Sequence, residues 1–186
     1  MKVINKQKVL EIVNLLFPYI EQKYGQVEGI YRHNGSKENV DLLIMKTFLN
    51  EPLDYQVQNV HTLCSFVKQL FRQLREENEF NSPPFPVNIV NALKICYQLK
   101  KSGGEYKIFL AQLLNKITGV DRELVVSFTR HLKKVAEQKS VNMMGLRALS
   151  ICWGPTVLYM MNLQDIQYDT DPSQVLLMVL EDFDTE

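Results

Sequence analysis

Apolar residues recur along this chain at the three- and four-residue spacing of amphipathic helices, and no segment alternates strictly enough to predict a strand. Ser36 is a residue type that caps helix N-termini, and Pro86 is a type that fits a first helical position. The pattern predicts helices at residues 6–24, 37–49, 60–74, 86–101, 105–117, 121–137, 146–161 and 172–182. We therefore expect an all-α fold, a single-domain bundle of about eight helices.

The segment 146–161 differs from the other predicted helices because it is apolar on almost every face. A helix of this kind is buried on all sides, so we expect it to be the central and most buried element. Pro155 lies inside it and lacks a backbone N–H, which predicts a kink or an interruption at that point.

The length and composition of the chain fit one soluble domain over residues 1–186, since 46% of the residues are hydrophobic. The 21 basic and 21 acidic residues cancel, which argues against nucleic-acid binding by bulk electrostatics but allows a local basic patch. The sequence shows no signal peptide and no apolar run that could cross a bilayer. Three cysteines without a disulfide framework fit a reducing compartment, so we expect a cytoplasmic protein.

Motifs of a self-contained active site are missing from the sequence. It contains no glycine-rich phosphate loop, no serine-nucleophile elbow and no histidines or cysteines at metal-ligand spacing. His33, His61 and His131 lie far apart, and His131 sits in an apolar helical pattern that favours a hydrogen-bonded core histidine over a ligand. We expect the chain to bind no cofactor and no metal of its own.

A short loop after the first predicted helix places a cation between two glycines. Gly29 and Gly35 permit positive φ angles and a tight turn, while the side chains of Ile30 and Tyr31 can anchor the loop in the core. Arg32 would then project outward. Taken alone, the segment fits a plain interhelical loop whose arginine caps a carbonyl better than it fits a functional site.

Two cations, Lys68 and Arg72, lie four residues apart on the predicted helix 60–74, in one column with His61 and Ser65 beside the apolar stripe. Like charges at this spacing repel weakly, so a further role would explain them. The column is either a face that meets an acidic partner or a merely solvated face, and on this pattern the two are equally favoured.

Five short segments, in this order, resemble the motifs of the RhoGAP domain, a GTPase-activating domain for Rho-family small GTPases. The resemblance extends over roughly residues 8–182. The matching residues are Glu28–Gly35 (EGIYRxxG), Lys68 and Arg72, the HLxxV residues His131, Leu132 and Val135, the VNxM residues Val141, Asn142 and Met144, and the LxIxxGPT residues Leu149, Ile151, Gly154, Pro155 and Thr156.

The resemblance implies an all-helical protein that binds the GTP-bound form of a Rho-family GTPase. In that family Arg32 corresponds to an arginine finger, which enters the partner's nucleotide pocket, and the GTP and Mg²⁺ belong to the partner. Lys68 and Arg72 correspond to a cationic pair that supports the finger loop and contacts the GTPase. Asn142 corresponds to an asparagine that hydrogen-bonds the partner's switch region, and Pro155 to a structural residue in the central helix behind the site.

The chain departs from the family pattern in several places. No proline follows the cationic helix at residues 74–77, which puts the shape of that rim and the partner selectivity in question. Gly145, Ala148 and Trp153 replace a Thr/Ser cap, an asparagine and a smaller aromatic residue. Because Arg32 is kept, we expect an active protein.

Two other functions are compatible with the sequence. A RhoGAP-like scaffold would bind a GTPase or another signalling protein without accelerating hydrolysis, and Arg32 argues against it because a scaffold does not need the finger. A module for inositides or membrane surfaces would use Lys68, Arg72, Lys133 and Lys134, but zero net charge and the lack of a dense basic cluster argue against it. We therefore expect no direct membrane binding and no nucleic-acid binding.

Overall fold

The computed structural model describes residues 4–74, 84–158 and 170–184, and within these ranges it is all-α, with nine α-helices, one short 3-10 helix and no strand. Eight of the α-helices have seven residues or more, which confirms the predicted fold class. The elements are α1 (Lys6–Tyr24), α2 (Lys37–Leu49), η1 (Tyr55–Val57), α3 (Val60–Gln73), α4 (Val87–Lys101), α5 (Lys107–Asn115), α6 (Gly119–Glu137), α7 (Lys139–Asn142), α8 (Leu146–Val157) and α9 (Pro172–Asp182).

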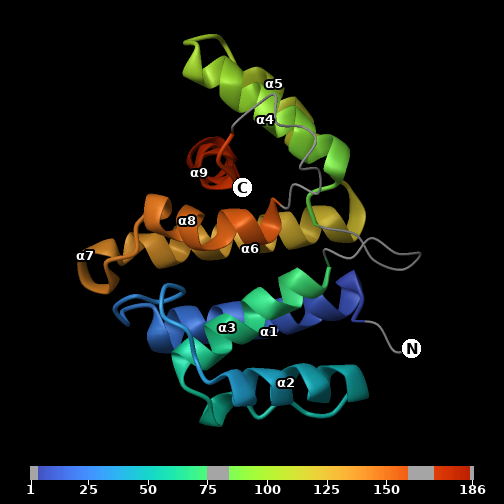
Figure 1. The fold of residues 1–186 in the computed structure, drawn as a ribbon, viewed down its shortest axis with the longest axis vertical. Helices are drawn as coiled ribbons and strands as arrows, with labels where there is room; N and C mark the ends of the chain where they lie inside the picture. The colour runs from blue at the N-terminus through green and yellow to red at the C-terminus, as the bar shows by residue number, and fades with distance from the viewer. Residues whose placement is uncertain (1–3, 75–83, 159–169, 185–186) are drawn as a thin grey trace.

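Four helices form the centre of the molecule. The pair α6 and α8 lies over the pair α1 and α3, and contacts between α1 and α6 and between α3 and α8 join the two layers (Figure 1). Helix α2 covers α3 from outside, and α9 packs against α8. Helices α4 and α5 contact α9 and form the far end of the molecule (Figure 1). The fold therefore puts the loop after α1 at the opposite end of the core from α4 and α5.

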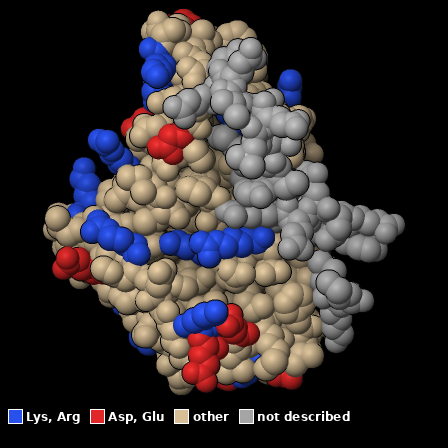
Figure 2. All heavy atoms as spheres, in the orientation of Figure 1, with Lys and Arg blue, Asp and Glu red and all other residues tan. Residues whose placement is uncertain are grey.

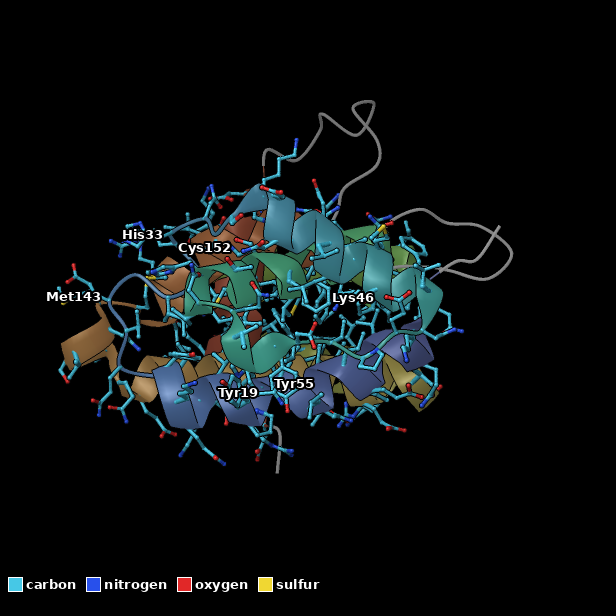
Figure 3. All side chains as sticks on the ribbon, turned by 90° about the horizontal axis from the view of Figure 1, so that it is seen from below. Tyr19, His33, Lys46, Tyr55, Met143 and Cys152 are labelled. Atoms are coloured by element: carbon cyan, nitrogen blue, oxygen red, sulfur yellow. The ribbon has the colours of Figure 1, made fainter. Side chains whose placement is uncertain are left out.

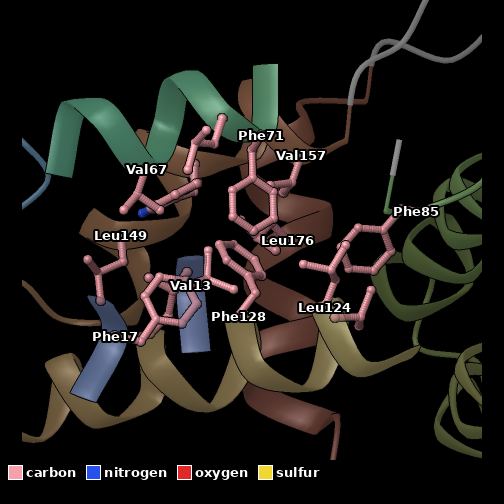
Figure 4. Packing of buried hydrophobic residues seen from close by; sticks show 14 of the residues in the cluster. Val13, Phe17, Val67, Phe71, Phe85, Leu124, Phe128, Leu149, Val157 and Leu176 are labelled. Carbon is pink, nitrogen blue, oxygen red and sulfur yellow. The ribbon is translucent and has the colours of Figure 1, made fainter. Parts of the chain in front are cut away.

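Aromatic side chains from three of the central helices meet in the core. Phe71 of α3 and Phe128 of α6 lie 5.4 Å apart between ring centroids, and Trp153 of α8 lies 5.4 and 5.0 Å from them (Figure 4 shows the two phenylalanines). All three are fully buried. Because burying a large aromatic side chain contributes several kcal/mol, this cluster is a main source of stability.

Helix α8 is less buried than its apolar sequence predicts. Arg147, Ile151 and Pro155 are spaced four residues apart and form an exposed stripe, with Ile151 56% exposed. Six of the twelve residues of α8 are buried, against eight of the fourteen in α3. The prediction that α8 is the most buried helix is therefore wrong, because α3, α6 and α9 leave one face of it uncovered.

Pro155 does not interrupt α8, which continues to Val157. The proline lacks the N–H that would bond the carbonyl four residues before it, yet the helix runs on for two more residues. The predicted extension of this helix to residue 161 and most of the segment 74–77 lie outside the described residues.

Several helix ends agree with the predictions and others differ by one or two residues. The hydroxyl of Ser36 accepts a hydrogen bond from the Asn39 amide, as expected of a cap. Pro86 is the cap of α4 and not its first residue. Helix α6 begins at Gly119, which places Asp121 in the first turn, where it pairs with Lys6 at 2.6 Å. None of the helices described is long and apolar enough to cross a bilayer.

Candidate functional site

The loop between α1 and α2 has an unusual backbone conformation. Gly29 and Tyr31 have φ angles of +68° and +67°. A side chain on Gly29 would lie 2.3 Å from the His33 ring. Left-handed geometry costs a non-glycine residue about 1–2 kcal/mol, so contacts elsewhere must offset that cost at Tyr31. Ile30 and Tyr31 are both fully buried, which confirms that they anchor the loop and leaves the next residue, Arg32, at the surface.

Tyr31 is held through both of its polar ends. Its hydroxyl lies 2.6 Å from Nε2 of His131, and its ring packs 5.2 Å from that of Trp153. Its carbonyl accepts a hydrogen bond from the ammonium of Lys68. Burial lowers the pKa of Lys68, since the charged form loses hydration there. Lys68 thus makes the loop-supporting contact that the resemblance implies.

The end of the loop rests on α3. The Gly35 amide donates to the hydroxyl of Ser65 at 3.0 Å, and the Ser36 amide donates to that of Thr62 at 3.1 Å. The rings of His33 and His61 meet edge to face at 5.4 Å. The predicted column on α3 is therefore not simply a solvated face, because His61, Ser65 and Lys68 contact the loop.

Gly35 lies so close to α3 that a methyl group has no room. A Cβ atom there would lie 2.2 Å from backbone atoms of Thr62. We expect Gly35→Ala to lower the free energy of unfolding by about 1–3 kcal/mol, measured by urea denaturation. Gly145→Ala is the control for a methyl group that has room, because its Cβ would meet only Cδ of Lys139, 3.8 Å away, and its cost is that of a weaker cap on α8. Equal midpoints for the two variants would contradict this account.

Arg32 is exposed, and its guanidinium donates to the carbonyl of Met143 at 3.2 Å. Met143 has a φ of +59°, is 58% exposed and joins α7 to α8. Figure 3 places Met143 with His33 and Cys152 at one end of the molecule. Among the described residues no carboxylate pairs with Arg32. The arginine does cap a carbonyl, as the plainer interpretation of the loop holds, but its charge is not neutralised there.

Asn142 is placed differently from what the resemblance implies. It is fully buried, its amide group donates to the carbonyls of Gly25 and Val135 at 2.8 and 2.9 Å, and its Oδ1 accepts from the Met144 amide. Its own carbonyl accepts from the Gly29 amide at 2.9 Å. The predicted hydrogen bond to a partner does not fit this geometry, because both donors are used inside the chain. Asn142 instead ties the loop to the connection between α6 and α8.

The remaining predicted residues lie on the surface. Arg72 is exposed one helical turn beyond Lys68, and Pro155 is exposed on α8 instead of lying behind the site. Figure 2 shows a row of Lys and Arg side chains across the middle of the face that carries α3 and α8. The site therefore combines a support made by the half-buried Lys68 and the buried Asn142 with an exposed basic rim that includes Arg32 and Arg72.

The lysines expected of a membrane-surface module are engaged in the fold. Lys68 bonds the Tyr31 carbonyl, and the Lys133 ammonium bonds the carbonyl of Phe183. Lys134 pairs with Glu137 at 2.9 Å. Because three of the four cations have partners within the chain, this geometry does not support a shared lipid-headgroup site.

Two histidines around the loop make stability depend on pH. Burial lowers the pKa of His131, although Glu21 acts in the opposite direction, and burial and the nearby His33 lower the pKa of His61. Well above about pH 6.5, the ordinary pKa of histidine, both histidines are neutral in the folded and unfolded chains. Below it the unfolded chain binds protons first, so we expect the urea midpoint to fall from pH 7.5 to pH 5.5. Burial would raise the pKa of Asp182, but its Tyr106 and lysine partners lower it. Asp182 therefore changes the stability of the fold only near pH 4 and below. A midpoint that rises over this range contradicts the expectation.

Comparisons with known proteins point to one family. Residues 11–161 match the family model described as the RhoGAP domain. Rho GTPase-activating protein 15 of Gallus gallus is 27% identical over 153 residues, covering 81% of this chain and 31% of that protein. The WW domain-containing protein tag-325 of Caenorhabditis elegans is 26% identical over 152 residues, covering 81% and 17%. The chain therefore spans less than a third of the length of these curated relatives.

Solved structures share the fold. The crystal structure of human Rho GTPase activating protein 15 superposes with a TM-score of 0.79 and 21% sequence identity, covering 99% of this chain and 92% of that one. The BH domain from GRAF, the GTPase regulator associated with focal adhesion kinase, superposes with a TM-score of 0.71 and 17% identity, covering 95% and 91%. At sequence identities this low, the structural similarity establishes that the helices are arranged in the same way, and nothing more.

Proposed function

This chain belongs to the RhoGAP domain family, and on that premise we propose that it binds the GTP-bound form of a Rho-family small GTPase and accelerates GTP hydrolysis with Arg32 as an arginine finger. The family consists of GTPase-activating proteins that lack a self-contained active site. One observation carries the proposal: an exposed guanidinium, unpaired with any described carboxylate, follows directly after a buried and doubly anchored tyrosine.

The chemistry of a guanidinium suits this role. During hydrolysis negative charge spreads over the transferring phosphoryl group and the leaving oxygen, and a planar, always-charged donor can contact both. A donor whose backbone is already in place loses little freedom when that charge develops. The hydrogen bond from Arg32 to the Met143 carbonyl is to a neutral acceptor, so phosphate oxygens can replace it at small cost. The GTP, the Mg²⁺ and the residue that orients the attacking water come from the partner.

The surface around Arg32 fits a protein partner. Arg72 supplies a second exposed cation, and Met143 and Ile151 supply exposed apolar side chains. Arginine and methionine are enriched in protein interfaces, where an apolar centre is surrounded by a polar rim. In this proposal Lys68 supports the finger from below and Arg72 meets acidic groups of the GTPase.

The test is single-turnover hydrolysis of GTP by a panel of Rho-family GTPases, with and without saturating amounts of this chain. We expect the chain to accelerate hydrolysis by at least one of them. Unchanged hydrolysis throughout the panel, with binding detected in parallel by titration, would identify the chain as a scaffold and overturn the catalytic proposal.

A further inference from the structure

A buried chain of hydrogen bonds connects the loop to two central helices. The Tyr31 hydroxyl lies 2.6 Å from Nε2 of His131, and Nδ1 of His131 lies 2.6 Å from Oε1 of Glu21. Tyr31 and His131 are buried, whereas the Glu21 side chain is 25% exposed. The three residues come from the loop, from α6 and from α1, and His131 lies 100 residues along the sequence from Tyr31 and 110 from Glu21.

The chemistry of the three groups determines which of them donates and which accepts in each hydrogen bond. An ionised carboxylate only accepts hydrogen bonds, so Nδ1 of His131 carries the proton that faces Glu21. Nε2 is then an acceptor, and the Tyr31 hydroxyl donates to it. Burial raises the pKa of Tyr31 well above its ordinary range, which keeps the hydroxyl protonated. Burial likewise lowers the pKa of His131, which keeps the ring neutral. Every polar atom of His131 is therefore satisfied.

Two further side chains pack against these hydrogen-bonded residues. The His131 ring stacks on Phe17 of α1 at 3.9 Å with an angle of 5° between the planes. The Cys64 thiol of α3 faces Tyr31, and burial raises its pKa to about 12, so it stays neutral. These contacts hold His131 in one orientation, and the position of its Nε2 determines how deeply the Tyr31 side chain can enter the core.

We infer that the chain Glu21–His131–Tyr31 is a positioning device that holds Arg32 where it can reach the partner's nucleotide, an inference that rests on the function proposed above. Tyr31 has a left-handed backbone, and its carbonyl is bonded by Lys68, so the depth of its ring sets where the next Cα begins. Packing alone could hold an aromatic ring loosely. The hydrogen bond to His131 fixes the ring at one depth and with it the direction of Arg32.

Tyr31→Phe removes the hydroxyl and keeps the ring. We expect the rate of stimulated hydrolysis at saturating GTPase to fall roughly 10- to 100-fold, because a misplacement of about 1 Å costs up to that much. The concentration of GTPase for half-maximal stimulation should change less than about twofold, since the finger acts mainly in the transition state. Tyr106→Phe is the matched control: it loses the 2.8 Å hydrogen bond to Asp182 at the other end of the molecule and should keep the wild-type rate.

Substitutions of Glu21 test whether the three hydrogen-bonded residues act together. Glu21→Ala should lower the rate although the Glu21 side chain bonds His131 and not Tyr31, and Glu21→Gln, whose amide oxygen can still accept from Nδ1, should restore most of it. The double variant Tyr31→Phe/Glu21→Ala should lose less than the product of the two single losses, because both break the same chain. Independent, multiplicative losses overturn the inference.

Hydrogen exchange separates this inference from the proposed function. The amides of Arg32 and His33 both donate to the Gly29 carbonyl, at 2.8 and 3.1 Å. In the free protein we expect Tyr31→Phe and Glu21→Ala to raise their exchange rates at least about tenfold, while the amides of α9 keep theirs. Unchanged exchange in the loop refutes the positioning role whether or not the chain activates a GTPase. Faster exchange in a chain that activates none would refute the proposed function alone.

Discussion

Arg32→Ala is expected to lower stimulated GTP hydrolysis by about 10³- to 10⁵-fold, the usual contribution of an arginine finger supplied in trans. The fold should be unaffected, because the side chain is exposed and, among the described residues, hydrogen-bonds only the Met143 carbonyl. Binding to the GTP-bound partner should weaken far less than the rate, since the guanidinium acts mainly in the transition state. Single-turnover rates at saturating chain, with the dissociation constant from a separate titration, measure both effects.

Two further variants make the result specific. Arg32→Lys keeps the charge and loses the planar fork, so its rate should lie between those of the wild type and Arg32→Ala. Arg130→Ala removes an exposed arginine of α6 and should leave the rate unchanged. If Arg32→Ala stimulates hydrolysis as well as the wild-type chain does, Arg32 is not the finger.

The positions of the helices could be predicted because helical periodicity is a local property of the sequence. Helix α3 shows this well, since its apolar residues follow one stripe and eight of them are buried. Burial of a whole helix is not local. Ile151 is as apolar as its neighbours on α8, yet it faces outward because α3, α6 and α9 approach from the other sides. Short elements such as η1 and α7 also escaped prediction, because they are too short to show a period.

The candidate site was predictable only in part, for a similar reason. The glycines around Arg32 and the column with Lys68 are visible in the sequence, and the structure brings them together. The contact of Arg32 with the Met143 carbonyl joins residues 111 apart and uses a backbone atom, which no residue type signals. The burial of Asn142 was missed because an asparagine before a helix can face inward or outward, and the sequence pattern is the same in both cases. His131 was correctly expected in the core, but its partners Glu21 and Tyr31 lie on other elements.

Trp153→Ala is expected to lower the free energy of unfolding by about 3–5 kcal/mol, the range for removing a large buried aromatic side chain. The indole is fully buried and packs on Tyr31, Phe71 and Phe128, so its loss leaves a cavity between α3, α6 and the loop. Trp153 is the only tryptophan, so unfolding in urea should be followed by circular dichroism and not by intrinsic fluorescence.

Trp153→Phe separates the effect of volume from that of the indole N–H. Nε1 of Trp153 is buried and finds no hydrogen-bond partner among the described residues. A buried donor without a partner costs about 1–3 kcal/mol, and phenylalanine removes it while filling most of the space. We therefore expect Trp153→Phe to cost much less than Trp153→Ala, because the relief of this donor offsets part of the lost packing. Equal costs for the two variants would mean that the edge of the indole, and not its bulk, stabilises the contact between α8 and the loop that carries Arg32.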